Sequence, residues 1–420
     1  MARRTKVSAL TEDVPIQTAG ATSVGCLATA LLTGGVDRHY AYGLATALAA
    51  SDIRVDVIGN DEVDSPEMHA TPNLTFFNLW PAKSAKANSF SKVSRILGHY
   101  GSLIRYAAVA RPRVFHILWN SKIKLFDRTL LMLYYRLLGK KIALTAHNVN
   151  QAKRDSRDTR LNRITLRIQY RLTHRIFVHT EKMKTELLED FGVADQSVVV
   201  ISYPINNAFP DSELTPSAAK AQLGLDESNK TILCFGKIKP YKGVEYLLSA
   251  FQTLVARDPQ YRLIIAGEVR KGDESYLDSL LRAIPREIER GEIILKEHFI
   301  PDEEMEIYFK AADALVLPYK DIFQSGVLFL GYSFGLPVIA TDVGSFREEI
   351  LEGETGYLCR PGDAADLAET IEIYFASNLY RNLDTLRQHI KNHAHAHHSW
   401  TAVANLTRRA YEAMLGNVNV

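Results

Sequence analysis

Lysines and glycines stand between a predicted strand and a predicted helix in the stretch FGKIKPYKGVEY, residues 235–246. The apolar run before it ends at Gly236, and Gly243 opens an amphipathic helix. Backbone N–H groups and the helix dipole favour an anion at such a place, and Lys237 and Lys242 add positive charge. The spacing matches neither the Walker loop nor the dinucleotide fingerprint. We interpret the stretch as a phosphate site; a surface turn that carries lysine is the alternative.

A second polar loop follows another predicted strand, within residues 313–349. The strand 314–317 leads into a loop with Gln324 and Ser325, and a helix is expected from Gly326. An amide, a hydroxyl group and helix N-terminal N–H groups can all donate hydrogen bonds to a ligand. This second segment strengthens the interpretation of the first as a ligand site.

Predicted strands and helices alternate through both halves of the chain. The strands are continuous apolar runs, which is typical of parallel sheets with helices on both faces. The expected strands are Ser23–Leu32, Arg54–Ile58, Leu74–Leu79, Val114–Leu118, Ile142–Ala146, Ile176–Val178, Val198–Ile201, 231–235, 262–266, 292–296, 314–317, 337–340 and 357–359. Expected helices include Val36–Ala50, Thr129–Leu138, Glu181–Asp190 and Ser399–Leu415. The pattern predicts an α/β fold of two doubly wound domains.

The domain boundary is expected in Tyr203–Ser217, where prolines and asparagines cluster. A chain of 420 residues, 46% of them apolar, can bury the cores of two or three domains. The apolar stretch Val24–Leu32 is too short for a transmembrane helix, and the polar N-terminus lacks the apolar core of a signal peptide. We expect a disordered tail over 1–22, domains over 23–205 and 206–375, and C-terminal helices over 376–420.

Ligands of doubly wound domains bind where the carboxyl ends of the strands meet. Gly34 and Gly35 stand at such an end, and a backbone without side chains can approach a ligand closely. A tight turn would use the same glycines. Asp37, Arg38 and His39 follow in the first helical turn, where they either reach the cleft or cap the helix.

His147 follows the strand Ile142–Ala146, in the sequence TAHNVN. A histidine at this end of a strand directs a polar group into the crevice, and Asn148 adds an amide beside it. The ordinary alternative is a loop histidine that is hydrogen-bonded to the backbone. We favour the cleft.

The segments GKIKPYKG and LPYKDIFQSGV…FGLPVIATDVGSFREEI resemble the retaining GT-B glycosyltransferases of family 4. The usual patterns of that family are G-R-x-x-x-x-K-G and P-S-x-x-E-G-F-G-x-x-x-x-E-A-x-A-x-G-x-P-V-I-A-T. The resemblance extends from about Gly25 to about Ile371. It implies two Rossmann-like domains that face each other across a cleft, the first for the acceptor and the second for a nucleotide sugar. It also implies that the last helix returns to the first domain.

The resemblance implies transfer of a sugar, with retention, from a nucleotide-diphosphate sugar to a lipid-linked or saccharide acceptor in surface or exopolysaccharide synthesis. The catalytic groups would be His147, near the reaction centre, with Lys237 and Lys242, which stabilise charge on the leaving diphosphate. The donor-binding residues would be Gly35, Gly236, Lys237, Lys242, Gly267, Asp321, Gln324, Ser325, Gly326 and Val327. The acceptor-binding residues would be Gly34, Arg38, His39 and Asn148. Because no D-x-D pattern occurs, we expect neither a metal nor another cofactor.

The chain departs from the family pattern at three positions. Lys237 stands where the family usually has arginine, which keeps the charge and loses bidentate contact. Ile322 and Leu330 stand where the family has two glutamates, and Asp321 and Gln324 are the nearest polar substitutes. These losses favour the alternative of a catalytically silent GT-B protein that binds a membrane or a partner. A hydride-transferring Rossmann enzyme is a more distant alternative.

Positive charge is concentrated in one part of the chain. Residues 81–175 contain 21 Lys/Arg and 3 Asp/Glu, a balance of +18, although the net charge of the chain is only +2. Basic residues recur at helical spacing from Arg157 to Arg175, and we expect Leu161 and Ile168 beside them to pack on the domain. A solvated helix face is one explanation. We favour contact with an anionic membrane through Arg160, Arg163, Arg167 and Arg171, on the inner face of the membrane in the cytoplasm. Nucleic acid is not expected, because stacking aromatic residues are missing from the stripe.

The cysteines and the C-terminal histidines are expected to have structural roles. Cys26, Cys234 and Cys359 are far apart in apolar runs, which is typical of reduced core residues in a cytosolic protein. Four histidines near the C-terminus have no carboxylate or cysteine beside them, so we expect a solvated helix end in preference to a metal site. They are His393, His395, His397 and His398.

Overall fold

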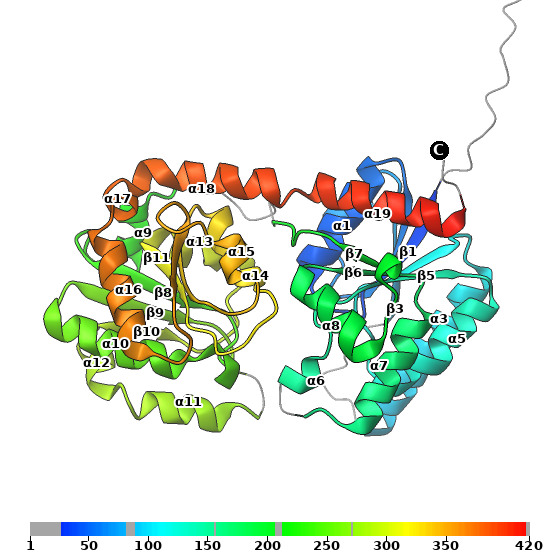
Figure 1. Ribbon diagram of the computed structural model, residues 1–420, viewed down its shortest axis with the longest axis horizontal. Coiled ribbons are helices and arrows are strands. Elements are labelled where there is room, and N and C mark those ends of the chain that lie inside the picture. Colours follow the sequence, from blue (N-terminus) through cyan, green and yellow to red (C-terminus); the bar gives the residue numbers. More distant parts are fainter. Residues whose placement is uncertain (1–26, 81–88, 155–156, 206–211, 270–271, 417–420) are drawn as a thin grey trace, which may run out of the picture.

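The computed structural model describes residues 27–80, 89–154, 157–205, 212–269 and 272–416. These residues form two lobes, each built on a parallel sheet with helices on both faces (Figure 1). The strand order is β3-β2-β1-β4-β5-β6-β7 in the first sheet and β10-β9-β8-β11-β12-β13 in the second. The predicted α/β architecture of two doubly wound domains is confirmed.

The first sheet is buried on both faces because its strands are almost wholly apolar. One face packs on α1 and α19, and the other on α3, α5, α7 and α8. The strands are β1 Ala28–Leu32, β2 Arg54–Asn60, β3 Leu74–Trp80, β4 Val114–Ile117, β5 Lys141–Thr145, β6 Arg175–Val178 and β7 Val198–Val200. The helices are α1 Arg38–Ala50, α2 Pro66–Ala70, α3 Ser89–Val109, α4 Lys124–Phe126, the π-helical turn η1 Asp127–Leu131, α5 Met132–Leu137, α6 Gln151–Arg154, α7 Arg160–Leu172, α8 Glu181–Phe191 and the short turn η2 Asp195–Ser197.

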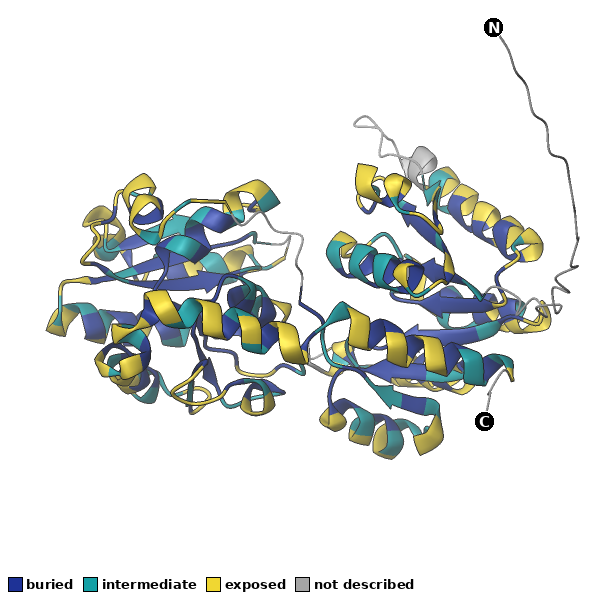
Figure 2. Ribbon diagram, turned by 90° about the horizontal axis from the view of Figure 1, so that it is seen from above, coloured by how far each residue is buried: buried dark blue, intermediate teal, exposed yellow. Residues whose placement is uncertain are grey.

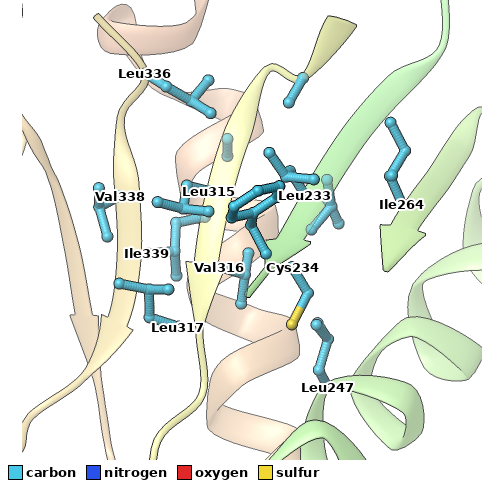
Figure 3. Packing of buried hydrophobic residues seen from close by; sticks show 14 of the residues in the cluster. Leu233, Cys234, Leu247, Ile264, Leu315, Val316, Leu317, Leu336, Val338 and Ile339 are labelled. Atoms are coloured by element: carbon cyan, nitrogen blue, oxygen red, sulfur yellow. The ribbon is translucent and has the colours of Figure 1, made fainter. Parts of the chain in front are cut away.

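The second sheet has the same construction, with Leu233, Ile264, Leu315 and Ile339 from adjacent strands in one continuous core (Figure 3). Its strands are β8 Lys230–Phe235, β9 Tyr261–Ala266, β10 Ile293–Lys296, β11 Ala314–Leu317, β12 Val338–Thr341 and β13 Gly356–Cys359. The helices are α9 Pro216–Gln222, η3 Pro240–Lys242, α10 Val244–Arg257, α11 Glu274–Leu281, α12 Pro285–Glu289, α13 Asp302–Ala311, α14 Gly326–Ser333, α15 Phe346–Glu349, α16 Ala364–Ala376, α17 Asn378–Arg381, α18 Leu383–His397 and α19 Trp400–Leu415. Figure 2 shows both sheets as buried layers beneath helices whose outer sides are exposed.

Two connections join the lobes, and they are tied together by His398. The Ile205 N–H donates to the His398 carbonyl over 3.0 Å, and His398 Nδ1 lies 3.0 Å from the Tyr203 carbonyl. His398 Nε2 lies 3.1 Å from the Glu349 carboxylate. The expectation of a solvated helix end is therefore wrong for His398, which is buried because both connections cross there.

The helix α19 leaves this junction and lies on α1 in the first lobe (Figure 1). Trp400 covers Gly43 so closely that a Cβ at that glycine would lie 2.2 Å from the indole. Several earlier expectations lie outside the described residues: the tail 1–22, Cys26, and the part of the linker over 206–211 where the domain boundary is expected. Among the described residues, Cys234 and Cys359 are buried free thiols.

The predicted arginine stripe is longer than the helix that carries it, because its first and last residues lie outside α7. Arg157 precedes α7, and Arg175 begins β6. The expectation that Leu161 and Ile168 pack on the domain is wrong, because both side chains are exposed. The buried side of α7 consists of Thr165, Leu166, Gln169 and Tyr170. Sequence hydrophobicity misjudged this face because a polar side chain is buried in it: the Gln169 amide exchanges hydrogen bonds with the Asn120 amide.

No helix in the described ranges has both the length and the apolar character needed to span a bilayer.

Candidate functional site

Each sheet has one place where the strand order reverses, and the two places define the candidate site. In the first sheet β2 and β4 flank β1, and in the second sheet β9 and β11 flank β8. Doubly wound sheets bind ligands in the crevice beyond the carboxyl ends of the strands at such a switch point. The glycine loops predicted from sequence follow β1 and β8.

On the second lobe, Gly236 and Gly267 follow the adjacent strands β8 and β9. Both have positive φ, 94° and 157°. A Cβ at Gly267 would lie 2.1 Å from the Gly236 carbonyl oxygen, so the two backbones touch without space for a side chain. A Cβ at Gly236 would lie 3.0 Å from Lys242 Nζ and 3.3 Å from a methyl group of Val327. The tertiary structure thus brings together four residues that the sequence assigns to the donor site.

The ammonium group of Lys242 is held below this glycine surface. Its side chain is buried, with Nζ 3.5 Å from the Phe235 carbonyl and 5.0 Å from the ring centroid of Tyr319. Its loop is fixed by Gly243, where a Cβ would lie 2.1 Å from the Pro318 carbonyl oxygen. Burial of an ammonium ion is costly, and a neighbouring anion offsets this cost. The geometry is therefore suited to a phosphate.

Lys237 has a different environment from Lys242. Its side chain is 45% exposed, and Nζ lies 3.8 Å from the Glu268 carboxylate. An exposed lysine with a carboxylate neighbour contributes less to binding of an anion than a buried one. We therefore expect Lys242 to be the more important of the two.

The loop before α14 contains an amide without a hydrogen-bond partner. Neither Oε1 nor Nε2 of Gln324 has a partner among the described residues, although both atoms are buried. Ser325 is buried beside it, 3.4 Å from the Tyr319 hydroxyl. An unpaired buried amide destabilises a protein by about 1–3 kcal/mol. A ligand that bonds this amide would offset that cost.

The two positions that lack the family's glutamates are filled by apolar packing. Ile322 is buried in the core of the second lobe. Leu330 lines a pocket of about 170 Å³ between the lobes, together with Tyr203, Phe329 and Trp400. Asp321 is exposed at the edge of the loop. The positions therefore provide packing surface in place of carboxylates.

On the first lobe, Gly34 and Gly35 form a left-handed turn with φ of 60° and 71°. A Cβ at Gly34 would lie 2.8 Å from the carbonyl oxygens of Trp119 and Asn120, which follow β4. The turn is therefore packed against the neighbouring loop at the switch point. The glycines thus form the tight turn that was the alternative interpretation, and close approach of their backbone to a ligand stays a prediction.

His147 lies in the same crevice, between three aromatic neighbours. Its ring stacks on Trp119, and its Nδ1 lies 3.2 Å from Nε2 of His179. Tyr40 contacts it edge-on, with ring centroids 4.6 Å apart. Removal from water, reinforced by His179 and His116, holds the pKa of His147 well below its usual range. The imidazole is neutral near pH 7, and its Nε2 has no partner in the described parts of the chain.

A pocket of about 210 Å³ opens beside His147, in the position expected for an acceptor. Asn148 lines it, as do Trp119, Asn120, Lys124 and Arg128, none of which the sequence reasoning identified. Trp119 and Asn120 lie in the loop that follows β4, next to the switch point, and that position was the available signal. The Arg128 guanidinium donates to Asn162 Oδ1 over 2.8 Å, while its buried Nε lacks a partner among the residues described.

Arg38 and His39 contact the second lobe. Arg38 Nη2 and His39 Nε2 each lie 3.0 Å from the carboxylate of Asp302, the first residue of α13. This ion pair joins the lobes across the cleft. Arg38 and His39 can bind an acceptor, as predicted, only if they break their contacts with Asp302 or contact Asp302 and the acceptor at the same time.

Tyr203, which follows β7, connects the candidate site residues of the first lobe with those of the second. A Cβ at Gly326 would lie 3.1 Å from the Tyr203 hydroxyl, so this tyrosine reaches the start of α14. Its ring also contacts His179, with centroids 5.0 Å apart, and His179 contacts His147. The start of α14 is thus linked to His147 through Tyr203 and His179. Within the described ranges, no group of three histidine, cysteine or acidic side chains is arranged to hold a metal ion.

Comparison with known proteins gives matches in both lobes. The family described as Glycosyltransferase Family 4 matches residues 33–209, and the family described as Glycosyl transferases group 1 matches residues 229–377. D-inositol 3-phosphate glycosyltransferase of Corynebacterium aurimucosum is 25% identical over 230 residues, 54% of this chain and 54% of that protein. Mannosylfructose-phosphate synthase of Agrobacterium fabrum is 25% identical over 244 residues, 56% of this chain and 52% of that protein. The chain thus spans about half the length of these curated relatives.

Solved structures share the fold over nearly the whole chain. Anabaena HepE in complex with UDP and glucose has a TM-score of 0.71 at 15% identity, covering 92% of this chain and 100% of that chain. Sucrose-phosphate synthase from Thermosynechococcus elongatus has a TM-score of 0.71 at 18% identity, covering 93% of this chain and 100% of that chain. At these identities the similarity is one of fold.

Proposed function

Because the chain belongs to the GT-B glycosyltransferases of group 1, we propose that it transfers a sugar from a nucleotide-diphosphate sugar to an acceptor held against the first lobe. The observation that carries the proposal is the buried Lys242 ammonium beside the backbone of Gly236, at the switch point of the second sheet. A diphosphate can approach the backbone of Gly236 and Gly267 closely, because neither residue carries a side chain of its own.

Cleavage of the donor leaves an additional negative charge on the terminal phosphate of the diphosphate. In this proposal Lys242 and the N-terminal N–H groups of α14 stabilise the charge as it develops, and Lys237 assists from the more exposed side. The unpaired Gln324 amide bonds the sugar or the ribose in the absence of the family's glutamates. Since charge stabilisation comes from lysines, transfer should continue in the presence of a metal chelator.

His147 acts at the sugar in this proposal. If His179 donates to His147 Nδ1, the proton of the neutral His147 ring is on Nε2, which then donates to a sugar hydroxyl group. The transferred sugar keeps its anomeric configuration, as the family resemblance implies. An NMR assignment of the product anomer tests this point, and inversion would contradict it.

The acceptor is proposed to be a lipid-linked or saccharide molecule in surface or exopolysaccharide synthesis. It occupies the pocket between Trp119, Asn148 and Arg128, where the unpaired guanidinium Nε favours an anionic or strongly polar group. The protein works in the cytoplasm on the inner surface of the membrane, where lipid-linked acceptors are accessible.

The test is donor hydrolysis assayed with UDP- and GDP-sugars, because hydrolysis needs no knowledge of the acceptor. Titration calorimetry with UDP and GDP accompanies it, with Lys242→Ala as the variant. Turnover that Lys242→Ala removes supports the enzyme. Binding of nucleotide without turnover of any donor would support the second candidate, a catalytically silent module, which the apolar Ile322 and Leu330 favour.

A further inference from the structure

Exposed apolar side chains are concentrated on one face of the first lobe. Of the nineteen exposed large hydrophobic side chains in the described residues, thirteen lie between Val93 and Ile168. Scattered exposed leucines are normal in proteins, but a contiguous set marks an interaction surface. This concentration of exposed apolar side chains therefore indicates that the face contacts another molecule or a membrane.

These side chains share three neighbouring helical segments that cover one face of the sheet. The segments α3, η1 with α5, and α7 lie side by side (Figure 1). The Tyr134 hydroxyl of α5 donates to the Ile104 carbonyl of α3, and Arg128 of η1 donates to Asn162 of α7. The outward leucines and isoleucines include Leu97, Leu130, Leu137, Leu161, Ile164 and Ile168, and Leu137 is 78% exposed. We call this surface the apolar–basic face.

The charges on the apolar–basic face have one sign. Arg136 on α5 and Arg160, Arg167 and Arg171 on α7 are exposed between the apolar residues. In residues 89–154 and 157–175 the acidic residues are Asp127, which is buried, and Asp158, which is bonded to Arg163 over 2.6 Å. These segments therefore present no unpaired exposed carboxylate in their described residues; Asp190 of the neighbouring α8 borders α7, with its carboxylate 3.2 Å from Lys153 Nζ.

We propose that the apolar–basic face docks on the surface of an anionic lipid bilayer, with its leucines and isoleucines inserted into the headgroup region and its arginines on the lipid phosphates. Helices that lie in the membrane interface have the same two features, an apolar side that faces the lipid and a polar side rich in Lys and Arg. Transfer of leucine and isoleucine side chains out of water lowers the free energy of the bound state. Each basic residue near the surface adds attraction to anionic headgroups. The occupant is a bilayer because both kinds of side chain alternate over the whole face.

The position of the face agrees with the proposed function, on which this step rests. Ile123 and Leu125 are exposed on the short segment whose Lys124 and Arg128 line the pocket beside His147. A bilayer under the apolar–basic face would therefore lie next to the pocket. A polar group carried on a membrane lipid enters it without leaving the surface.

Insertion predicts a specific dependence on salt. Between ~0.1 M and ~1 M salt the Debye length falls from ~10 Å to ~3 Å, so attraction of the arginines weakens while apolar insertion persists. Wild-type protein should co-sediment with vesicles of phosphatidylglycerol and phosphatidylcholine at low salt and remain partly bound at high salt. Purely electrostatic docking would be lost at high salt.

The variants separate the two contributions. L130Q/L137Q/L161Q should lower the partition coefficient at least about tenfold at high salt, because three inserted side chains are lost. R160E/R167E/R171E should lose binding mainly at low salt. The matched control I288Q/I373Q/L406Q removes exposed apolar residues elsewhere and should bind as wild type does.

The proposal is overturned by wild-type protein that stays in the supernatant at low salt, or by a leucine variant that binds like the control at high salt. Dimers of the wild type that L130Q/L137Q/L161Q dissociates would make the face a subunit interface and also overturn it. Donor hydrolysis is measured on every variant. Its failure in the wild type would refute the proposed function, whereas loss of vesicle binding with hydrolysis intact concerns only the docking face.

Discussion

The imidazole of His147 lies flat against the indole of Trp119, with ring centroids 4.3 Å and planes 4° apart. The two residues follow the adjacent strands β5 and β4, so the parallel sheet itself brings them together. Stacking fixes the plane of the imidazole, while His179 fixes its rotation. A histidine held in this way is prepared to direct one nitrogen at a ligand.

Replacement of His147 by Ala should slow sugar transfer far more than it weakens donor binding. The reason is that His147 belongs to the first lobe, while the diphosphate is expected on the second. The measurement is kcat for transfer beside the Kd for the nucleotide sugar. Equal losses in both, or no loss in either, would show a structural role.

Lys242→Ala should weaken binding of a nucleotide diphosphate by about 10- to 150-fold, which corresponds to the ~1.5–3 kcal/mol of a hydrogen bond to a charged group. Calorimetry measures the affinity, and circular dichroism checks that the fold is retained. Lys320→Ala is the control, because Lys320 is an exposed lysine paired with Glu245 over 2.8 Å. An unchanged affinity in Lys242→Ala would remove the phosphate assignment.

Gln324→Met should stabilise the unliganded protein by about 1 kcal/mol and weaken donor binding at the same time. The physical reason is that the amide has no partner until a ligand supplies one, so an apolar side chain of similar shape removes a cost. Urea unfolding with and without nucleotide sugar measures both effects. A variant that is less stable without ligand would mean that the amide is already bonded.

Stability should decline as the pH falls below about 6.5, the ordinary pKa of histidine. Burial lowers the pKa of His116 to about 3 and that of His179 to about 4, so these residues stay neutral in the folded protein while the unfolded chain takes up protons. Each contributes a slope of about 1.4 kcal/mol per pH unit between ~6.5 and its folded pKa.

The variant His116→Asn tests this acid sensitivity. His116 lies 2.6 Å from the Tyr411 hydroxyl and 2.8 Å from that of Thr145, so the variant will be less stable at neutral pH. The decisive quantity is the pH slope of its unfolding free energy, which should be shallower than that of the wild type. Equal slopes would contradict the burial of a neutral His116.

Much of the fold was predictable because it depends on local pattern. Parallel strands covered on both faces must be continuous apolar runs, and their helices must alternate with them, so the strands were located within a few residues. The expected strand over 337–340, for example, is β12 Val338–Thr341. Glycines 236 and 267 were also identifiable, since their loops follow strands of a recognisable motif.

The sequence by itself determined the two doubly wound domains, the glycine and lysine loops and the concentration of positive charge. Only the tertiary structure decided that Arg38 and His39 reach Asp302, that His398 is buried at the crossing of the two connections, and that Leu161 is exposed. Each of these depends on an element distant in sequence: α13, Glu349 or the packing of α7 through Gln169. Contacts of that kind are set by how the elements pack, and the periodicity of one segment carries no information about the surface that another segment presents.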